Sequence, residues 1–130
     1  MLNKALISIV DDDESVREAM QALMKSLGLA AEVFASAEEF LASDSGSRAA
    51  CLITDMQMPG LTGLGLHDRL VASGNPVPTI VITAYPDERA RARALQAGVA
   101  CYLIKPFNEI DLLTCIRSIL DRRGDEERGS

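Results

Sequence analysis

Acidic, hydroxyl and basic residues follow several short apolar segments of this 130-residue sequence. Asp11, Asp12 and Asp13 follow the first segment, Asp55 follows another, and Lys105 follows the last. Bare carboxylates repel phosphate, but they suit Mg²⁺, which prefers oxygen ligands and commonly takes one or two carboxylates. A metal between the acids and a phosphoryl group would make this set chemically sensible. The pattern therefore predicts a divalent cation between these carboxylates and a phosphate group.

The charges of this set do not balance without a metal. Asp11, Asp12 and Asp55 against Lys105 leave a formal charge of −2, and one Mg²⁺ brings it near zero. Without the ion the carboxylates should repel one another, so at least one should resist ionisation. Asp13 fits the N-cap of the following helix better than a metal ligand. Taken alone, the run Asp11-Asp12-Asp13 could simply cap that helix. Only Asp55 and Lys105, at the ends of other strands, favour a metal site instead.

The segments before these residues read as β-strands. Continuous apolar runs such as Ile80-Val81-Ile82 are typical of strands covered on both faces, hence of a parallel sheet. We expect strands at residues 5–10, 31–34, 50–54, 79–83 and 100–104. Because the carboxyl ends of parallel strands share one edge, where such sheets bind ligands, the polar residues should converge there.

Helical patterns lie between and after these strands. Expected helices span about residues 16–27, from 36 onward, 63–72, 87–97, and from 108 to about 120. Five β-α units imply a single α/β domain built as a three-layer sandwich. The alanine-rich helix at 87–97 buries little area and should be weakly anchored. We assign residues 1–121 to this domain and 122–130 to a polar tail or linker.

Composition excludes several function classes. Thirteen Lys and Arg against nineteen Asp and Glu give a net charge of −6, which argues against direct nucleic-acid binding. No apolar run approaches the ~20 residues of a membrane helix. Cys51, Cys101 and Cys115 form no metal-binding spacing and suggest reduced, half-buried thiols in a cytoplasmic protein. The sole histidine, His67, is expected at the surface.

Four motifs in this order resemble the receiver domain of bacterial two-component response regulators. They are Ile9-Val10-Asp11-Asp12-Asp13, Thr54-Asp55-Met56-Gln57-Met58-Pro59-Gly60, Ile82-Thr83-Ala84 and Lys105-Pro106-Phe107. The resemblance covers about residues 5–121. It implies a flavodoxin-like fold whose five parallel strands have the order 2-1-3-4-5. It also implies a signalling switch rather than a turnover enzyme.

The resemblance assigns a role to each acidic residue. Asp55 would be the phosphoacceptor and would form an aspartyl phosphate by nucleophilic attack. Asp11, Asp12 and Asp55 would hold Mg²⁺, or Mn²⁺ in its place, directly or through water. The backbone carbonyl of Gln57 would complete the protein ligands.

The same resemblance assigns the remaining site residues. Lys105 and Thr83 would bind phosphoryl oxygens, and Lys105-Pro106 would carry a cis peptide. On phosphorylation, Thr83 would move toward the new group and Tyr102 would turn inward as the switch aromatic. Tyr102 could equally be an ordinary half-buried strand residue. Gln57 and Tyr85, which lie two residues after Asp55 and Thr83, would tune the lifetime of the phosphoryl group. The Tyr85 ring would shield that group from water.

The partners implied by the resemblance are those of a signalling module. A sensor histidine kinase would supply the phosphoryl group. The face formed by the helix at 87–97, the strand at 100–104 and the last helix would change shape and support a homodimer or an output partner. Most such domains are joined to a DNA-binding domain, which favours transcriptional control.

Three other functions compete with this interpretation. Asp11 to Val16 also fit the D-x-D-x-[ST]-V pattern of haloacid-dehalogenase-like phosphohydrolases, with Asp11 as nucleophile and Asp13 as acid/base. The chain is short for that fold and has no later Asp-Asp metal pair. A receiver-like interaction module that is never phosphorylated is a second alternative. Such a module would not need the complete set of Asp11, Asp12, Asp55, Thr83 and Lys105. A flavin-binding protein would need a glycine- and hydroxyl-rich first loop.

Overall fold

The computed structural model describes the backbone of residues 5–129 and the side chains of residues 5–122. Within this range five strands alternate with six helices. The strands are β1 (Leu6–Val10), β2 (Ala30–Phe34), β3 (Cys51–Asp55), β4 (Thr79–Thr83) and β5 (Cys101–Ile104). The helices are α1 (Glu14–Ser26), α2 (Ala37–Leu41), α3 (Ser45–Arg48), α4 (Gly63–Ala72), α5 (Glu88–Gln96) and α6 (Glu109–Gly129).

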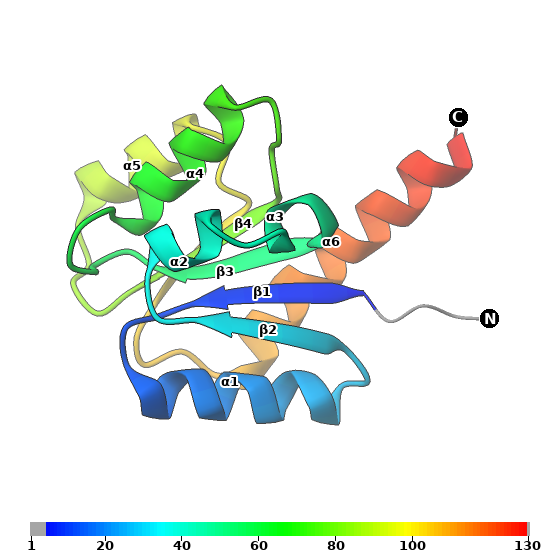
Figure 1. Cartoon of the computed structure of the whole chain (residues 1–130), viewed down its shortest axis with the longest axis horizontal. Helices are drawn as coiled ribbons and strands as arrows, with labels where there is room; N and C mark the ends of the chain where they lie inside the picture. Colours follow the sequence, from blue (N-terminus) through cyan, green and yellow to red (C-terminus); the bar gives the residue numbers. More distant parts are fainter. Residues whose placement is uncertain (1–4, 130) are drawn as a thin grey trace.

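The sheet has the expected topology. All neighbouring strands pair in parallel, in the order β2-β1-β3-β4-β5. Helices α1 and α6 cover one face, and α2 to α5 lie on the other (Figure 1). Every residue of β3 and β4 is buried, which explains why these central strands are apolar throughout except at a few threonines and the terminal aspartate. The predicted three-layer α/β sandwich and its strand order are confirmed.

The two faces of the sheet contribute to separate cores. The face toward α1 and α6 buries the larger cluster, which includes Ile9, Ile53, Met24, Leu112 and Ile116. The opposite face has two smaller clusters, one around Phe40 and Leu66 and one around Val81 and Ala94. Removing this apolar surface from water stabilises the sheet whose ends carry the polar residues.

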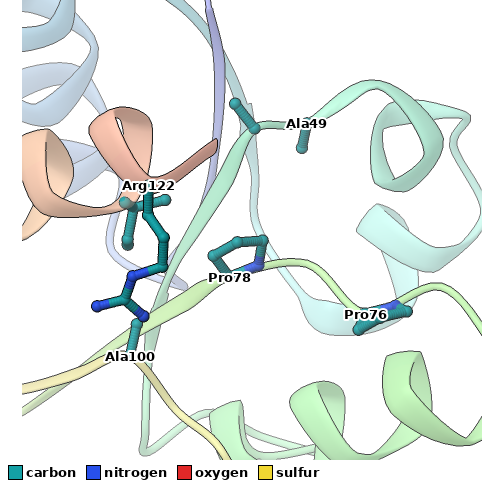
Figure 2. Close-up of a pocket in the computed structure, with 7 residues that line it drawn as sticks. Ala49, Pro76, Pro78, Ala100 and Arg122 are labelled. Atoms are coloured by element: carbon teal, nitrogen blue, oxygen red, sulfur yellow. The ribbon is translucent and has the colours of Figure 1, made fainter. Parts of the chain in front are cut away.

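Two ends of the sheet differ in what they can bind. A cavity of about 310 Å³ lies at the amino end of the central strands, lined by Ala49, Ala50, Pro76, Pro78, Ala100, Ile119 and Arg122 (Figure 2). Its small apolar walls and single guanidinium offer little chemistry. At the carboxyl end, a space of about 20 Å³ is lined in part by Asp11, Asp55 and Lys105. The polar cluster therefore lies at the opposite end from the roomier cavity.

Two helices depart from the sequence expectation. The short α3 was not predicted, because Ser45-Gly46-Ser47-Arg48 reads as a turn; the buried Ser45 hydroxyl is hydrogen-bonded to that of Ser8 in β1. Helix α6 continues to Gly129, where we expected an irregular tail from residue 122. Arg and Glu are good helix formers, so the lack of an apolar period there does not end the helix. Assignment of 122–130 as a linker remains a prediction.

His67 is buried, which corrects the expectation of a surface position. Only 4 % of its surface is exposed, and the buried side of α4 consists of Gly63, Leu66, His67 and Leu70. These four residues recur at helical spacing and so lie on one face of α4. His67 is buried because it belongs to that face, although its side chain is polar. Among the described side chains, none forms a hydrogen bond with its Nδ1 atom.

The cysteines form no disulfide bond, as expected, but Cys51 is fully buried rather than half-buried. All three thiols are unpaired; Cys51 is buried, and Cys101 and Cys115 are half-buried. Burial and the neighbouring Cys101 raise the pKa of Cys115 to about 12. No helix in the described part of the chain combines the length and apolar character needed to cross a membrane.

Candidate functional site

Asp11 and Asp12 follow β1 directly and therefore begin at the carboxyl edge of the sheet. Asp11 is only 5 % exposed, and its Oδ1 atom accepts the backbone N–H of Asp13 at 2.9 Å. Arg17, one turn into α1, donates from its guanidinium to the backbone carbonyl of Asp11 at 2.7 Å. These bonds fix the orientation of Asp11, whereas Asp12 is exposed to solvent.

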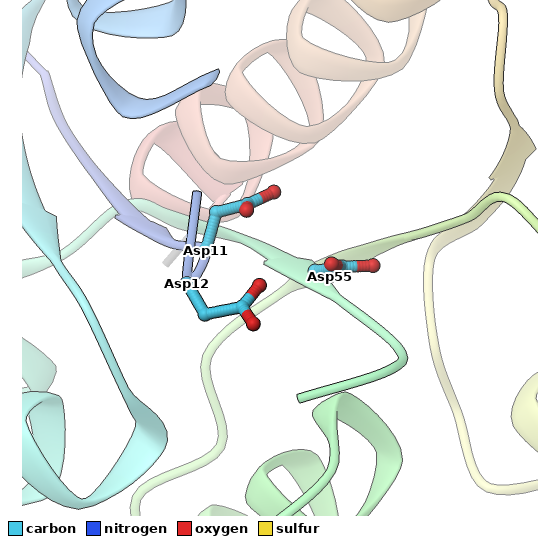
Figure 3. Close-up of side chains that lie close together, drawn as sticks. All are labelled: Asp11, Asp12 and Asp55. Carbon is cyan, nitrogen blue, oxygen red and sulfur yellow. The ribbon is translucent and has the colours of Figure 1, made fainter. Parts of the chain in front are cut away.

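Asp55 ends β3, the strand next to β1, so its carboxylate faces those of the first loop. One carboxylate oxygen from each of Asp11, Asp12 and Asp55 lies within 4.8 Å of the others. Figure 3 shows the three side chains at the adjoining ends of the two strands. Three hard oxygen donors at this spacing suit a divalent cation such as Mg²⁺.

Lys105 supplies the only positive charge that pairs with these acids in the described part of the chain. Its Nζ atom lies 3.7 Å from Asp11 Oδ2 and 3.9 Å from Asp55 Oδ2. The backbone N–H of Lys105 donates to Thr83 O at 2.7 Å, which continues the pairing of β4 with β5. The Lys105-Pro106 bond is cis, as the sequence analysis expected.

Electrostatics of the cluster favour an additional positive charge. Burial raises the pKa of Asp11 and the charge of Asp12 adds to the effect, whereas the hydrogen bond from the backbone N–H of Asp13 opposes it. Burial also raises the pKa of Asp55, assisted by Asp11 and Asp12, although Lys105 opposes both shifts. The ionised carboxylates are therefore disfavoured in the protein alone. A bound cation would remove this cost, so the residues present fit a metal.

Gly63 allows α4 to begin immediately beside Asp55. A Cβ atom at Gly63 would lie 2.5 Å from the backbone oxygen of Asp55 and 3.2 Å from the Cα atom of Met56. The helix is capped by Thr62, whose hydroxyl accepts the N–H of Gly65 at 3.0 Å. Glycine costs helix stability, but at position 63 the close backbone approach requires it.

Thr83, Gln57 and Tyr85 form a second polar group at the end of β4. The Thr83 hydroxyl donates to Gln57 Oε1 at 2.8 Å and accepts the backbone N–H of Tyr85 at 3.0 Å. Thr83 is buried, whereas the Tyr85 side chain is 69 % exposed. The structure thus connects three of the residues singled out from the sequence.

Tyr102 lies on β5, where its side chain packs against the cluster that contains Met56, Val81 and Ala94. Its hydroxyl is buried and forms no hydrogen bond with any described residue. Burial, together with Asp87 and Glu88 at the start of α5, raises the pKa of this phenol. The ring therefore packs against a cluster contributed by β4, by α5 and by Met56, which follows Asp55.

Asp13 acts as the N-cap of α1, as predicted. Its carboxylate accepts the N–H groups of Ser15 at 2.9 Å and Val16 at 3.4 Å, as well as the Ser15 hydroxyl at 2.7 Å. These bonds lower the pKa of Asp13. A phosphohydrolase acid/base needs a carboxyl group that can carry a proton, and this environment favours the ionised form instead. The cap therefore argues against that alternative.

Three residues that support the site were not predicted from the sequence. Arg17 orients Asp11, and Gly63 permits the approach of α4, as described above. Glu38 in α2 accepts the N–H of Leu61 at 3.1 Å and so holds the loop that follows Asp55. The spacing of Arg17 from the aspartates and the glycine at a helix start were available signals; nothing local in sequence connects Glu38 with Leu61.

Comparisons with known proteins agree with this geometry. Residues 7–117 match the family described as the response regulator receiver domain. Response regulator protein TodT of Pseudomonas putida is 39 % identical over 116 residues, which are 89 % of this chain and 51 % of TodT. The transcriptional regulatory protein FixJ of Azorhizobium caulinodans is 34 % identical over 94 % of this chain and 58 % of its own length. The chain thus spans about half the length of these curated relatives.

Solved structures give the same result at the level of the fold. The response regulator StyR superposes with a TM-score of 0.87 at 36 % identity, covering 98 % of this chain and 64 % of that chain. The structure titled FixJ-N superposes with a TM-score of 0.81 at 30 % identity, covering 91 % of this chain and 94 % of that chain.

Proposed function

Because this chain belongs to the response regulator receiver family, we propose that Asp55 is its phosphoacceptor and that Asp11, Asp12 and Asp55 hold Mg²⁺. Receiver domains are the signalling switches of two-component systems, and their acidic pockets generally bind this ion. One observation carries the proposal: three carboxylates within 4.8 Å of one another lie beside a lysine that reaches two of them. Mn²⁺ is expected to substitute for Mg²⁺.

The proposed reaction follows from this charge arrangement. An oxygen of Asp55 attacks the phosphorus of a phosphohistidine on a sensor kinase; an O–P bond forms as the P–N bond breaks. Lys105 neutralises one phosphoryl oxygen, and the bound cation would neutralise the acids that otherwise repel the incoming group. Asp11, Asp12 and the backbone carbonyl of Gln57 would position that cation. The chain itself supplies positioning and charge, which account for most of the catalysis in phosphoryl transfer.

The response to phosphorylation would be carried by Thr83 and Tyr102. A phosphoryl group adds roughly −1.5 to −2 charge at Asp55 and strong hydrogen-bond acceptors. Thr83 would turn toward it, and Tyr102 would then adjust against α5. Support comes from α5, which buries only Ala94 and can therefore move at small cost. The surface of α5, β5 and α6 would present the altered shape to a homodimer partner or an output domain. Tyr102→Ala should weaken phosphorylation-dependent association, and unchanged association would contradict this role.

Tyr85 and Gln57 would tune the lifetime of the phosphoryl group. We expect Tyr85→Ala to speed dephosphorylation, as followed by loss of phosphoprotein mass. With 69 % of its surface exposed, the Tyr85 side chain would have to turn inward to shield the group. An unchanged or slower loss would contradict the shielding role.

The biological setting is proposed from the relatives. TodT is a response regulator and FixJ a transcriptional regulatory protein. Because the chain spans about half of their lengths, we propose that it acts in the cytoplasm with a histidine kinase and controls transcription through a DNA-binding domain joined to it.

The site of phosphorylation can be located directly. We would incubate the chain with a small phosphodonor and Mg²⁺, trap the acyl phosphate by borohydride reduction and identify the modified residue by peptide mass. Modification at Asp55 supports the receiver chemistry, and modification at Asp11 would support the phosphohydrolase instead. Asp13→Asn is the matched control, because it changes a neighbouring acid that only caps α1.

A further inference from the structure

Thr83 has one hydroxyl proton, and the structure shows where it goes. Its Oγ1 atom lies 2.8 Å from Gln57 Oε1, whereas the carbonyl of Tyr85 is farther away, at 3.3 Å. The hydroxyl oxygen accepts the N–H of Tyr85 at 3.0 Å. A hydroxyl can donate only one hydrogen bond at a time. The proton that would stabilise a phosphoryl oxygen is therefore already donated to Gln57.

The backbone on both sides of this hydrogen bond is fixed. Thr83 O accepts the N–H of Lys105 at 2.7 Å, and Met56, next to Gln57, donates its N–H to Ile82 O at 2.8 Å. A change of partner by the hydroxyl thus requires rotation of the Thr83 side chain, not movement of the strand. Gln57 is exposed, so its amide can turn into water once the bond is broken.

From this geometry we propose that Gln57 is a positioning residue that acts through Thr83: its side-chain oxygen retains the hydroxyl proton in the resting state, and a phosphoryl group on Asp55 must displace it. The inference rests on the proposed phosphoacceptor role of Asp55. Gln57 would then have two separate contributions, a backbone carbonyl toward the metal and a side-chain amide that opposes switching.

The expected size of the effect follows from the type of bond. The net contribution of one neutral hydrogen bond corresponds to roughly a two- to tenfold change in an equilibrium constant. Gln57→Met keeps the length of the side chain and the backbone carbonyl but removes the acceptor. It should therefore strengthen binding of a phosphoryl mimic by about two- to tenfold.

Beryllofluoride with Mg²⁺, a mimic of the aspartyl phosphate, is the probe. Its half-saturating concentration would be measured by NMR for the wild type, Gln57→Met, Thr83→Val and the double variant. Thr83→Val keeps the branched shape and removes the hydroxyl. We expect Gln57→Met to lower the half-saturating concentration when Thr83 is present and to have no effect when position 83 is valine. If Gln57 had only a structural role, the effect of Gln57→Met would not depend on whether position 83 is threonine or valine.

The outcomes separate the two proposals. If the wild type binds beryllofluoride but Gln57→Met binds no more tightly, or gains equally in the valine background, Gln57 does not act through Thr83 and the inference is wrong. If the wild type does not bind beryllofluoride at all, the phosphoacceptor role of Asp55 fails and the inference fails with it. NMR spectra of the unliganded variants report in the same experiment that each is folded.

Discussion

Helix α5 is anchored much less firmly than α1 and α6, which cover the opposite face of the sheet. Helices α1 and α6 bury long side chains, among them Met24, Leu112 and Ile116, in the larger core. Helix α5 buries only Ala94. The loops before α1 and α6 carry Asp11 and Lys105, whereas the loop before α5 follows Thr83. The charged residues Asp11 and Lys105 thus lie next to firmly packed helices. Thr83, which is expected to move, lies before the loosely packed α5.

The largest expected effect on stability comes from a substitution in the core. Leu112→Ala removes a fully buried side chain of α6 and should cost about 2–5 kcal/mol of unfolding free energy. Leu95→Ala on α5, where the side chain is 40 % exposed, should change it by no more than ~0.5 kcal/mol. Urea denaturation measures both. Similar losses from the two variants would show that α5 is anchored as firmly as α6.

The next test concerns the backbone around Asp55. Gly63→Ala places a Cβ atom 2.5 Å from the Asp55 carbonyl oxygen. Such overpacking costs typically 1–3 kcal/mol, and it should also slow phosphorylation by displacing Asp55. In the matched variant Gly65→Ala, the new atom meets only side-chain atoms, the end of Leu61 at 2.8 Å and the Thr62 hydroxyl at 3.2 Å, and no backbone. Urea denaturation should therefore show a smaller loss for Gly65→Ala, and an equal or larger one would contradict the close-approach argument.

A smaller effect is expected from charge removal in the acidic cluster. Because burial raises the folded-state pKa of Asp11, the folded chain binds more protons than the unfolded chain between the usual aspartate pKa and the raised value. Stability therefore falls as pH rises through that interval and stays lower at neutral pH. Without metal, Asp11→Asn should unfold at a higher temperature than the wild type at pH 7. The difference should shrink below about pH 4, near the ordinary aspartate pKa.

Mg²⁺ supplies the control for this prediction. A ligand that binds only the folded state raises its stability, so the ion should stabilise the wild type more than Asp11→Asn. Thermal unfolding at pH 7 with and without Mg²⁺ measures both effects. A metal-free Asp11→Asn variant that is less stable than the wild type would contradict the proposed repulsion.

The smallest effect is expected at Tyr102. Its buried hydroxyl has no partner among the described residues, so Tyr102→Phe removes a polar group without breaking a hydrogen bond. The unfolding free energy should stay the same or rise by up to about 1 kcal/mol. Denaturation of the two proteins side by side tests this. A loss of more than that amount would mean that the hydroxyl stabilises the contact with α5.

The sequence predicted the sheet well because its signals are local. Continuous apolar runs marked the strands, and the alternation with helices implied a parallel sheet whose carboxyl ends meet. That edge brings Asp11, Asp55 and Lys105 together, as expected. The cap at Asp13 was equally local, since its side chain bonds within three residues.

What the sequence did not predict depends on contacts between distant segments. The Thr83–Gln57 bond joins residues 26 positions apart, and the Glu38–Leu61 bond spans 23. Neither has a local pattern. His67 is different, because the helical period places it between Leu66 and Leu70 on the buried side; there the polarity of one residue was given too much weight.

The central claim is that Asp55 accepts a phosphoryl group only when a divalent cation balances its acidic neighbours. The most direct test is the intact mass of the chain after incubation with a small phosphodonor, with Mg²⁺ or with a chelator, for the wild type and Asp55→Asn. We expect the added mass of one phosphoryl group for the wild type with Mg²⁺, and none for the other three combinations of protein and metal condition. Equal gain in the presence of the chelator, or in Asp55→Asn, would contradict the central claim.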